Sequence, residues 1–128
     1  MDKLIAWVEI PTADFERAVT FYSSVFKLDL TQIDCGDGVP TPDGDEGEKM
    51  ACFPTGEGAI VYSPHAKPSE NGAIVSFTVP DSIEATISRI EKANGKVVIP
   101  KTKIEAEGKG YFALCMDSEN NKIGLYEN

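Results

Sequence analysis

The stretch WVEIPTADFERAVTFY, residues 7–22, decides how the chain begins to fold. The apolar residues of 4–10, which overlap the start of this stretch, predict a strand. The strand ends at Pro11 because proline has no backbone N–H to donate. Asp14 can then cap a helix by accepting hydrogen bonds from its first turn. The apolar residues that follow recur at steps of three and four, so they form one face of that helix. The members of this face are Phe15, Ala18, Val19, Tyr22, Val25 and Phe26.

Three short strands are predicted after this helix, at residues 28–33, 50–53 and 59–62. Each is apolar or alternates apolar with polar positions, and turn-forming residues bound each one. The acidic segment 34–48 is rich in Gly and Pro, which predicts a long loop between the first two strands. The first half of the chain is therefore expected to run strand, helix, strand, strand, strand.

The same order of elements repeats after a proline-containing linker at 64–71. A strand over 73–79 precedes Asp81 and Glu84, whose D-x-x-E spacing is typical of a helix start. The pair Asn94-Gly95 is expected to end this helix, because glycine accepts the left-handed conformation at a helix end. The inward residues of the helix are predicted to be Ile83, Ile87, Ile90 and Ala93. The remaining strands are predicted at 96–99, 111–116 and 122–126, with a turn at 117–121.

This duplication predicts an α+β fold made of two βαβββ modules. A chain of 128 residues is long enough for one core, so we expect a single domain over 1–128. Module 1 covers about 3–63, and module 2 covers about 72–128. The two curved sheets are expected to pair around a cleft, with the helices on the outer face.

Composition and charge exclude several functions. The net charge is −9, which disfavours binding to a phosphate backbone, so no nucleic-acid partner is expected. Six of the 21 acids lie in 34–48, a segment with no base, which is expected to be a solvated loop or a lid over the cleft. No apolar run has the length of a membrane helix and no signal peptide is visible, so no membrane partner is expected. Three cysteines without C-x-x-C spacing indicate neither disulfides nor a zinc site, and the expected location is a reducing cytoplasm.

Two segments carry a resemblance to a known family. WVEIPTADFERAVTFY at 7–22 and GYFALCMDSENNKIGL at 110–125 resemble the vicinal oxygen chelate superfamily, which includes glyoxalase I, extradiol dioxygenases, epimerases and bleomycin-resistance proteins. The chain is most similar to the small glyoxalase-related proteins of that group. The resemblance implies paired βαβββ modules around a cleft. It also implies a divalent metal, held by His, Gln and Glu side chains, that polarises oxygens of the substrate.

The positions that match the metal ligands of this family hold other residues. By the family's spacing, the ligand positions fall at Trp7, Ile74 and Gly124, and the strand 59–62 contains no acid. A catalytic metal site needs about three N, O or S side-chain ligands. No metal and no other cofactor is therefore expected. The single histidine, His65, is expected to be a solvated loop residue, and carboxylates of 34–48 lack the spacing of an EF-hand Ca²⁺ site.

Strand alternation predicts which side chains face the cleft. The expected ligand-binding residues are Trp7, Glu9, Ile74, Ser76, Thr78, Lys122, Gly124 and Tyr126. Glu9 is the candidate catalytic residue, because a carboxylate on a central strand beside Trp7 would be partly desolvated and could act as a general base. It could equally be a structural carboxylate that accepts hydrogen bonds from Lys122 or a backbone amide. Trp7 and Tyr126 could stack on a planar ligand or fill the space of the missing metal.

These observations predict a glyoxalase-like protein that binds an unknown small molecule in a β-sheet cleft. One alternative is a metal-dependent lyase or isomerase of the glyoxalase type, with ligands such as Glu9 and loop carboxylates. Another is a regulatory or protein-interaction domain. A homodimer is expected, because the two sheets have open edges that invite pairing with another subunit.

Overall fold

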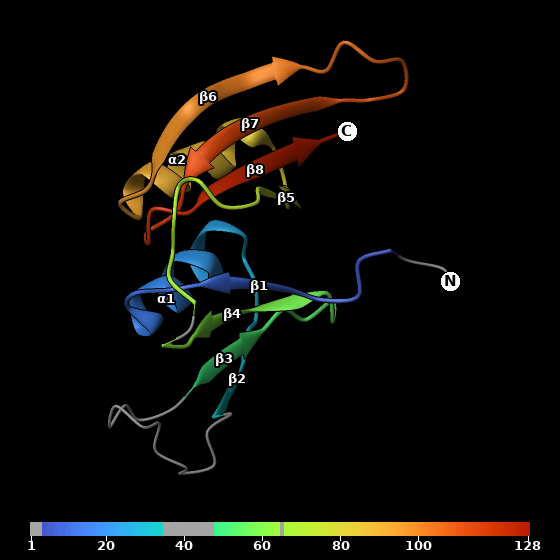
Figure 1. Cartoon of the computed structure of the whole chain (residues 1–128). Helices are drawn as coiled ribbons and strands as arrows, with labels where there is room; N and C mark the ends of the chain where they lie inside the picture. The colour runs from blue at the N-terminus through green and yellow to red at the C-terminus, as the bar shows by residue number, and fades with distance from the viewer. Residues whose placement is uncertain (1–3, 35–47, 65) are drawn as a thin grey trace.

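The computed structural model describes residues 4–34, 48–64 and 66–128, and it contains the two predicted βαβββ modules (Figure 1). Module 1 consists of β1 (Val8–Pro11), α1 (Phe15–Val25), β2 (Thr31–Asp34), β3 (Lys49–Cys52) and β4 (Gly58–Tyr62). Module 2 consists of β5 (Val75–Thr78), α2 (Ile83–Lys92), β6 (Lys96–Lys103), β7 (Tyr111–Met116) and β8 (Lys122–Glu127). The predicted order of elements is confirmed. His65 and most of the acidic segment lie outside the described residues.

Each module contains a four-stranded sheet with the same topology. The strand orders are β1-β4-β3-β2 and β5-β8-β7-β6. β1 pairs in parallel with β4, and β5 pairs in parallel with β8, whereas the remaining pairs are antiparallel. The first strand of each module is thus an edge strand. Within the described part of the chain, this arrangement leaves one edge of β1 and one edge of β5 without a partner strand.

The start of α2 differs from the prediction. Asp14 caps α1 as expected, and its carboxylate accepts a hydrogen bond from the backbone N–H of Arg17 at 3.1 Å. In α2, however, Ser82 is the N-cap and accepts from the N–H of Ala85 at 3.1 Å. The Asp81 carboxylate instead pairs with Arg89 at 2.9 Å and with Lys27 at 3.2 Å. Asp and Ser both make good caps, and the two cations draw Asp81 away from the helix end.

The end of α2 also differs in detail. Asn94, and not Gly95, adopts the left-handed conformation, with φ of 70°. Gly95 is required for another reason. A Cβ at this position would lie 2.5 Å from Cγ2 of Ile90 and 2.6 Å from the carbonyl oxygen of Met116. The chain therefore needs glycine here because the end of α2 packs closely on β7.

The helices lie together where the modules meet, since α1 contacts α2 (Figure 1). Their buried faces join the inner faces of both sheets in one hydrophobic core. The predicted stripe of α1 is buried apart from Val19, which is partly exposed. Burial also raises the pKa of the Cys115 thiol to about 11, so that this core cysteine stays protonated. Neither of the two helices of the described chain is long and apolar enough to cross a membrane.

Candidate functional site

The burial of alternate strand residues agrees with the two faces that alternation predicts. The residues expected to point toward the helices are buried or half-buried. They are Val8, Ile10, Val75, Phe77, Val79, Ile123 and Leu125. The residues expected to face the cleft are exposed or half-buried, apart from Gly124, which is buried. They are Trp7, Glu9, Ile74, Ser76, Thr78, Lys122, Gly124 and Tyr126.

Glu9 lies on an edge strand and is exposed to solvent. Its carboxylate accepts a hydrogen bond from the indole Nε1 of Trp7 at 3.1 Å, instead of the expected Lys122 or backbone partner. The expectation that Glu9 would be partly desolvated on a central strand was therefore wrong. Its role as a general base stays a prediction without the support of burial.

Gly124 lies close to the Ser76 side chain. It pairs with Ser76 across the parallel β5–β8 ladder, and a Cβ at Gly124 would collide with the Ser76 hydroxyl. Trp7 and Ile74, which occupy two other positions of the resemblance's ligand set, are 43% and 49% exposed, and neither side chain suits a metal. Among the described residues, no group of three or more His, Cys, Asp or Glu side chains is placed to hold a metal ion. The described residues at these positions therefore do not fit the metal that the resemblance implies.

A pocket of about 370 Å³ lies between the edge strands β1 and β5. Its volume is at the lower end of the range of about 300–1,000 Å³ that is typical of ligand sites. It is lined by Val8, Phe26, Leu28, Phe53, Thr55, Glu57, Val75, Ser76, Phe77 and Thr78. Of the predicted ligand-binding residues, only Ser76 and Thr78 line it. Trp7, Glu9, Ile74, Lys122, Gly124 and Tyr126 do not.

Aromatic rings from both modules make one side of this pocket. The Phe77 ring centroid is 4.7 Å from that of Phe26 and 5.8 Å from that of Phe53. Tyr22 adds a fourth ring behind them, 5.7 Å from Phe77. Phe26 is buried, whereas Phe53 and Phe77 are half-buried, so two of the rings present surface to a molecule in the pocket.

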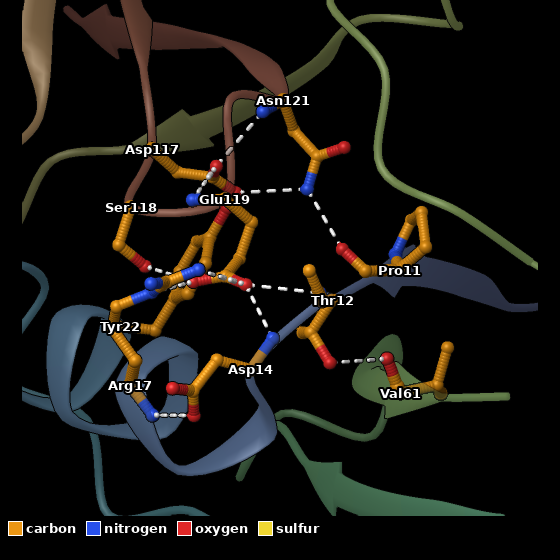
Figure 2. A network of polar contacts seen from close by, with 11 residues as sticks. Pro11, Thr12, Asp14, Arg17, Tyr22, Val61, Asp117, Ser118, Glu119 and Asn121 are labelled. Atoms are coloured by element: carbon orange, nitrogen blue, oxygen red, sulfur yellow. Dashed lines mark hydrogen bonds and ion pairs between the residues drawn. The ribbon is translucent and has the colours of Figure 1, made fainter.

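A network of polar contacts fixes the relative position of the modules next to this aromatic cluster (Figure 2). The hydroxyl of Tyr22 in α1 donates to the buried Asp117 carboxylate at 2.6 Å. Asp117 also accepts from the backbone N–H groups of Glu119 and Asn121, at 2.8 and 2.9 Å, and from the Asn121 amide at 3.0 Å. The same amide donates to the carbonyl oxygen of Pro11 in β1 at 2.8 Å. The turn at 117–121 therefore holds module 1 from within module 2.

Glu119 makes the second half of this network (Figure 2). One carboxylate oxygen accepts from the backbone N–H groups of Ala13 and Asp14, at 2.9 and 2.7 Å, just before α1 begins. The other accepts from Arg17 Nε at 2.7 Å. Burial by itself raises the pKa of Glu119, but the hydrogen bonds from Arg17, Asp14, Ser118 and Ala13 outweigh it and lower the pKa. Glu119 is thus an ionised carboxylate at the helix N-terminus, where a negative charge is favourable.

Comparison with known proteins identifies the family. A sequence model of the Glyoxalase/Bleomycin resistance protein/Dioxygenase superfamily matches residues 4–125. The chain belongs to this superfamily. No curated protein sequence matches the chain.

Solved structures of the superfamily share the fold at low sequence identity. Glyoxalase I from Zea mays is similar with a TM-score of 0.66 and 18% identity, covering 95% of this chain and 45% of that one. The chain thus spans less than half of the maize protein. A glyoxalase/bleomycin resistance protein/dioxygenase family enzyme from Burkholderia phytofirmans PsJN has a TM-score of 0.65 and 18% identity, covering 96% of this chain and 97% of that one. A mutant of the fosfomycin resistance protein FosX from Listeria monocytogenes, solved with Mn(II) and 1S,2S-dihydroxypropylphosphonic acid, has a TM-score of 0.67 and 15% identity, covering 100% and 93%.

Most of the residues that line the pocket of this superfamily member were not predicted from the sequence. Phe26 and Phe53 are most simply expected to be core, and both do pack in or against it. Both residues also line the pocket because of the gap between β1 and β5, and no local sequence pattern predicts that gap. The one sequence feature that could have indicated these pocket residues is the hairpin 53–58, in which Phe53, Thr55 and Glu57 occupy alternate positions.

Proposed function

We propose that the protein binds a small organic molecule in the pocket between β1 and β5, and that it does so without the divalent metal of its superfamily. The observation that carries the proposal is the pocket itself, about 370 Å³ with a largely apolar lining from both modules. Ligand sites are typically apolar cavities with a few convergent polar groups. Here Thr55, Glu57, Ser76 and Thr78 supply those groups.

The crowding at Gly124 supports the metal-free part of the proposal. At this position the Ser76 hydroxyl occupies the space into which a ligating side chain would project. A substitution at Gly124 would require the Ser76 side chain to rotate away before a ligating side chain could occupy this position. Metal-dependent lyase or isomerase chemistry is the competing function, and metal titration separates the two.

The metal test uses the unfolding midpoint and elemental analysis. A metal at a thousand times its dissociation constant stabilises the native state by about 4 kcal/mol. For a domain of this size, each kcal/mol shifts the midpoint by roughly 3–5 °C. We expect chelator, and titration with nickel, zinc, manganese or iron, to change the midpoint by less than about 2 °C. A rise of more than about 10 °C with one ion, abolished by Glu9→Gln, would support the lyase alternative.

The pocket test uses a thermal-shift screen of small aromatic and metabolite ligands on a matched pair of variants. Val75→Phe adds volume to the pocket wall, whereas Val98→Phe makes the same change on β6, where Val98 is 47% exposed and away from the pocket. Ligands that stabilise the wild type should still stabilise Val98→Phe and should fail to stabilise Val75→Phe. If no ligand in the screen distinguishes the two variants, the result would favour the alternative that the protein is a regulatory or interaction domain.

We also propose that the protein forms a homodimer in a reducing cytoplasm. Leu4 and Ile5 are 85% and 62% exposed, and the partly exposed apolar residues Ile33 and Ile99 lie on β2 and β6, the outer edge strands. Exposed apolar groups beside open edges favour contact with another chain. Sedimentation at tens of micromolar should give twice the chain mass of 13.9 kDa, and a single-chain mass would contradict the proposal.

A further inference from the structure

We infer that the pocket between β1 and β5 selects a compact aromatic ligand that carries a cationic amine. This inference rests on the proposed function, because it assigns a ligand class to the same pocket. It goes beyond the fold and the family, since it depends on the aromatic side and on the charge of the rim. Both features come from one short hairpin and the strand that faces it.

The hairpin between β3 and β4 places a ring and a carboxylate on the same pocket. The N–H of Phe53 donates to the carbonyl oxygen of Gly58 at 2.9 Å, and the N–H of Gly56 donates to the carbonyl oxygen of Phe53 at 3.1 Å. The carbonyl oxygen of Glu57 accepts from the N–H of Val8 at 3.1 Å, which ties the hairpin to β1. The positions of Phe53 and Glu57 are therefore fixed by the backbone.

The aromatic side favours a flat ring over an aliphatic chain. Phe53 and Phe77 meet edge to face, with an angle of 83° between their planes, and both remain half-exposed toward the pocket. A planar ligand can stack on one ring and present its edge to the other, which are the preferred geometries for aromatic pairs. Val8, Leu28 and Val75 complete the apolar wall. The small volume limits the ligand to a compact ring system.

The rim charge favours a cation. Among the described residues 4–34, 48–64 and 66–128, Glu57 is the only ionisable one that lines the pocket, and no Lys, Arg or His of these ranges does so. The other polar side chains are the neutral hydroxyls of Thr55, Ser76 and Thr78. An ammonium group would pair with the Glu57 carboxylate and could also approach the face of a Phe ring. An anionic ligand would meet a carboxylate with no compensating side-chain charge.

The free edge of β5 is the competing influence on selectivity. An edge strand presents unpaired backbone N–H groups, which bind acceptors such as a carboxylate. If these groups dominate, an aromatic acid should bind better than an aromatic amine. The two possibilities are separated by probes that share one ring and differ in charge.

The experiment measures affinities by isothermal titration calorimetry for tryptamine, indole-3-acetic acid, indole and butylamine at pH 7. For the wild type we expect tryptamine to bind at least about tenfold more tightly than the acid, and also more tightly than indole or butylamine. Glu57→Gln should reduce the affinity for tryptamine to that for indole, while leaving the affinity for indole unchanged. Glu107→Gln, at an exposed carboxylate away from the pocket, should leave all four affinities unchanged.

The results also distinguish this inference from the proposed function. Equal affinities for tryptamine and indole, or tighter binding of the acid, would overturn the ligand class. The pocket would remain the proposed binding site if Val75→Phe removed that binding and Val98→Phe did not. If no ring compound binds up to millimolar concentration, the ligand class is overturned. The proposed function then fails only if the broader ligand screen also yields nothing that Val75→Phe blocks.

Discussion

Replacing Tyr22 with Phe removes one oxygen atom from the contact between the two modules. The Tyr22 hydroxyl donates to Asp117 at 2.6 Å, and both residues are at most 1% exposed. In the variant, this carboxylate oxygen of Asp117 keeps one donor, the Asn121 amide at 3.0 Å. A hydrogen bond to a charged group contributes about 1.5–3 kcal/mol. We therefore expect Tyr22→Phe to lower the free energy of unfolding by about 2 kcal/mol, which is roughly 6–10 °C in the midpoint.

A matched control is available in the same chain. Tyr126→Phe makes the same chemical change, but the Tyr126 hydroxyl is 3.4 Å from its partner, the side chain of the exposed Asn128. Substitutions at such surface contacts usually change stability by no more than about 0.5 kcal/mol. Urea unfolding at pH 7 measures both variants. Equal losses in Tyr22→Phe and Tyr126→Phe would refute the assignment of the stabilisation to the buried pair.

The pH dependence gives a second readout of the same contact. Burial, together with the charge and hydrogen bonding of Asp117, raises the pKa of Tyr22 well above its usual value. The unfolded chain loses this proton near pH 10, whereas the folded chain retains it. The stabilisation is therefore complete below pH 10 and is lost as the pH rises above it. Tyr22→Phe should unfold with a weaker alkaline dependence than the wild type, and an identical slope would contradict the reasoning.

Three further predictions concern other described residues. Because its hydrogen bonds lower the pKa of Glu119, this carboxylate contributes stability above the unfolded pKa of about 4.3 that is lost as the pH falls through the folded pKa. Urea unfolding of Glu119→Gln should accordingly show a smaller loss between pH 5 and 3 than the wild type. Gly95→Ala should cost about 1–3 kcal/mol because its Cβ meets Ile90 and Met116, whereas Gly72→Ala, with its nearest atom at 3.9 Å, should cost far less. Glu9→Gln should leave stability within about 0.5 kcal/mol, because Glu9 is exposed. It should also leave ligand binding in the thermal-shift assay unchanged, because Glu9 does not line the pocket, and weaker binding would restore Glu9 as a binding residue.

The fold was predictable because its signals are local. The stripe of α1, the cap at Asp14 and the repeated order of elements depend on residues close together in sequence. The prediction of local structure is wrong where residues distant in the sequence determine the contacts. Asp81 fails to cap α2 because Arg89 and Lys27 bind its carboxylate, and Lys27 comes from the other module. A spacing rule within one helix contains no information about that cation.

The candidate site was less predictable for a related reason. Alternation predicts that Ser76 and Thr78 of β5 share one face, but the pocket is lined by residues from both faces of that strand. This is possible because β5 is at the edge of its sheet and β1 is at the edge of the other. A side chain on a central strand contacts only the space over its own face of the sheet. A pocket beside an edge strand can be reached by side chains from both faces of that strand. The prediction placed Glu9 on a central strand and assigned Val75 and Phe77 to the face toward the helices, so it did not include either residue among those that line the pocket.

The polar network explains how such a gap can persist between two modules with a shared core. Apolar side chains alone would favour closing a 370 Å³ space between Val8 and Val75, because closure would bury more apolar surface. Glu119, Asp117 and Asn121 resist that closure by fixing Ala13, Tyr22 and Pro11 at hydrogen-bond distances. Closure would break bonds of buried charged groups, at a cost of about 1–3 kcal/mol for each group left unsatisfied. We therefore expect the turn at 117–121 to act as a spacer. On this reasoning, Tyr22→Phe should change ligand affinity as well as stability, although Tyr22 does not line the pocket.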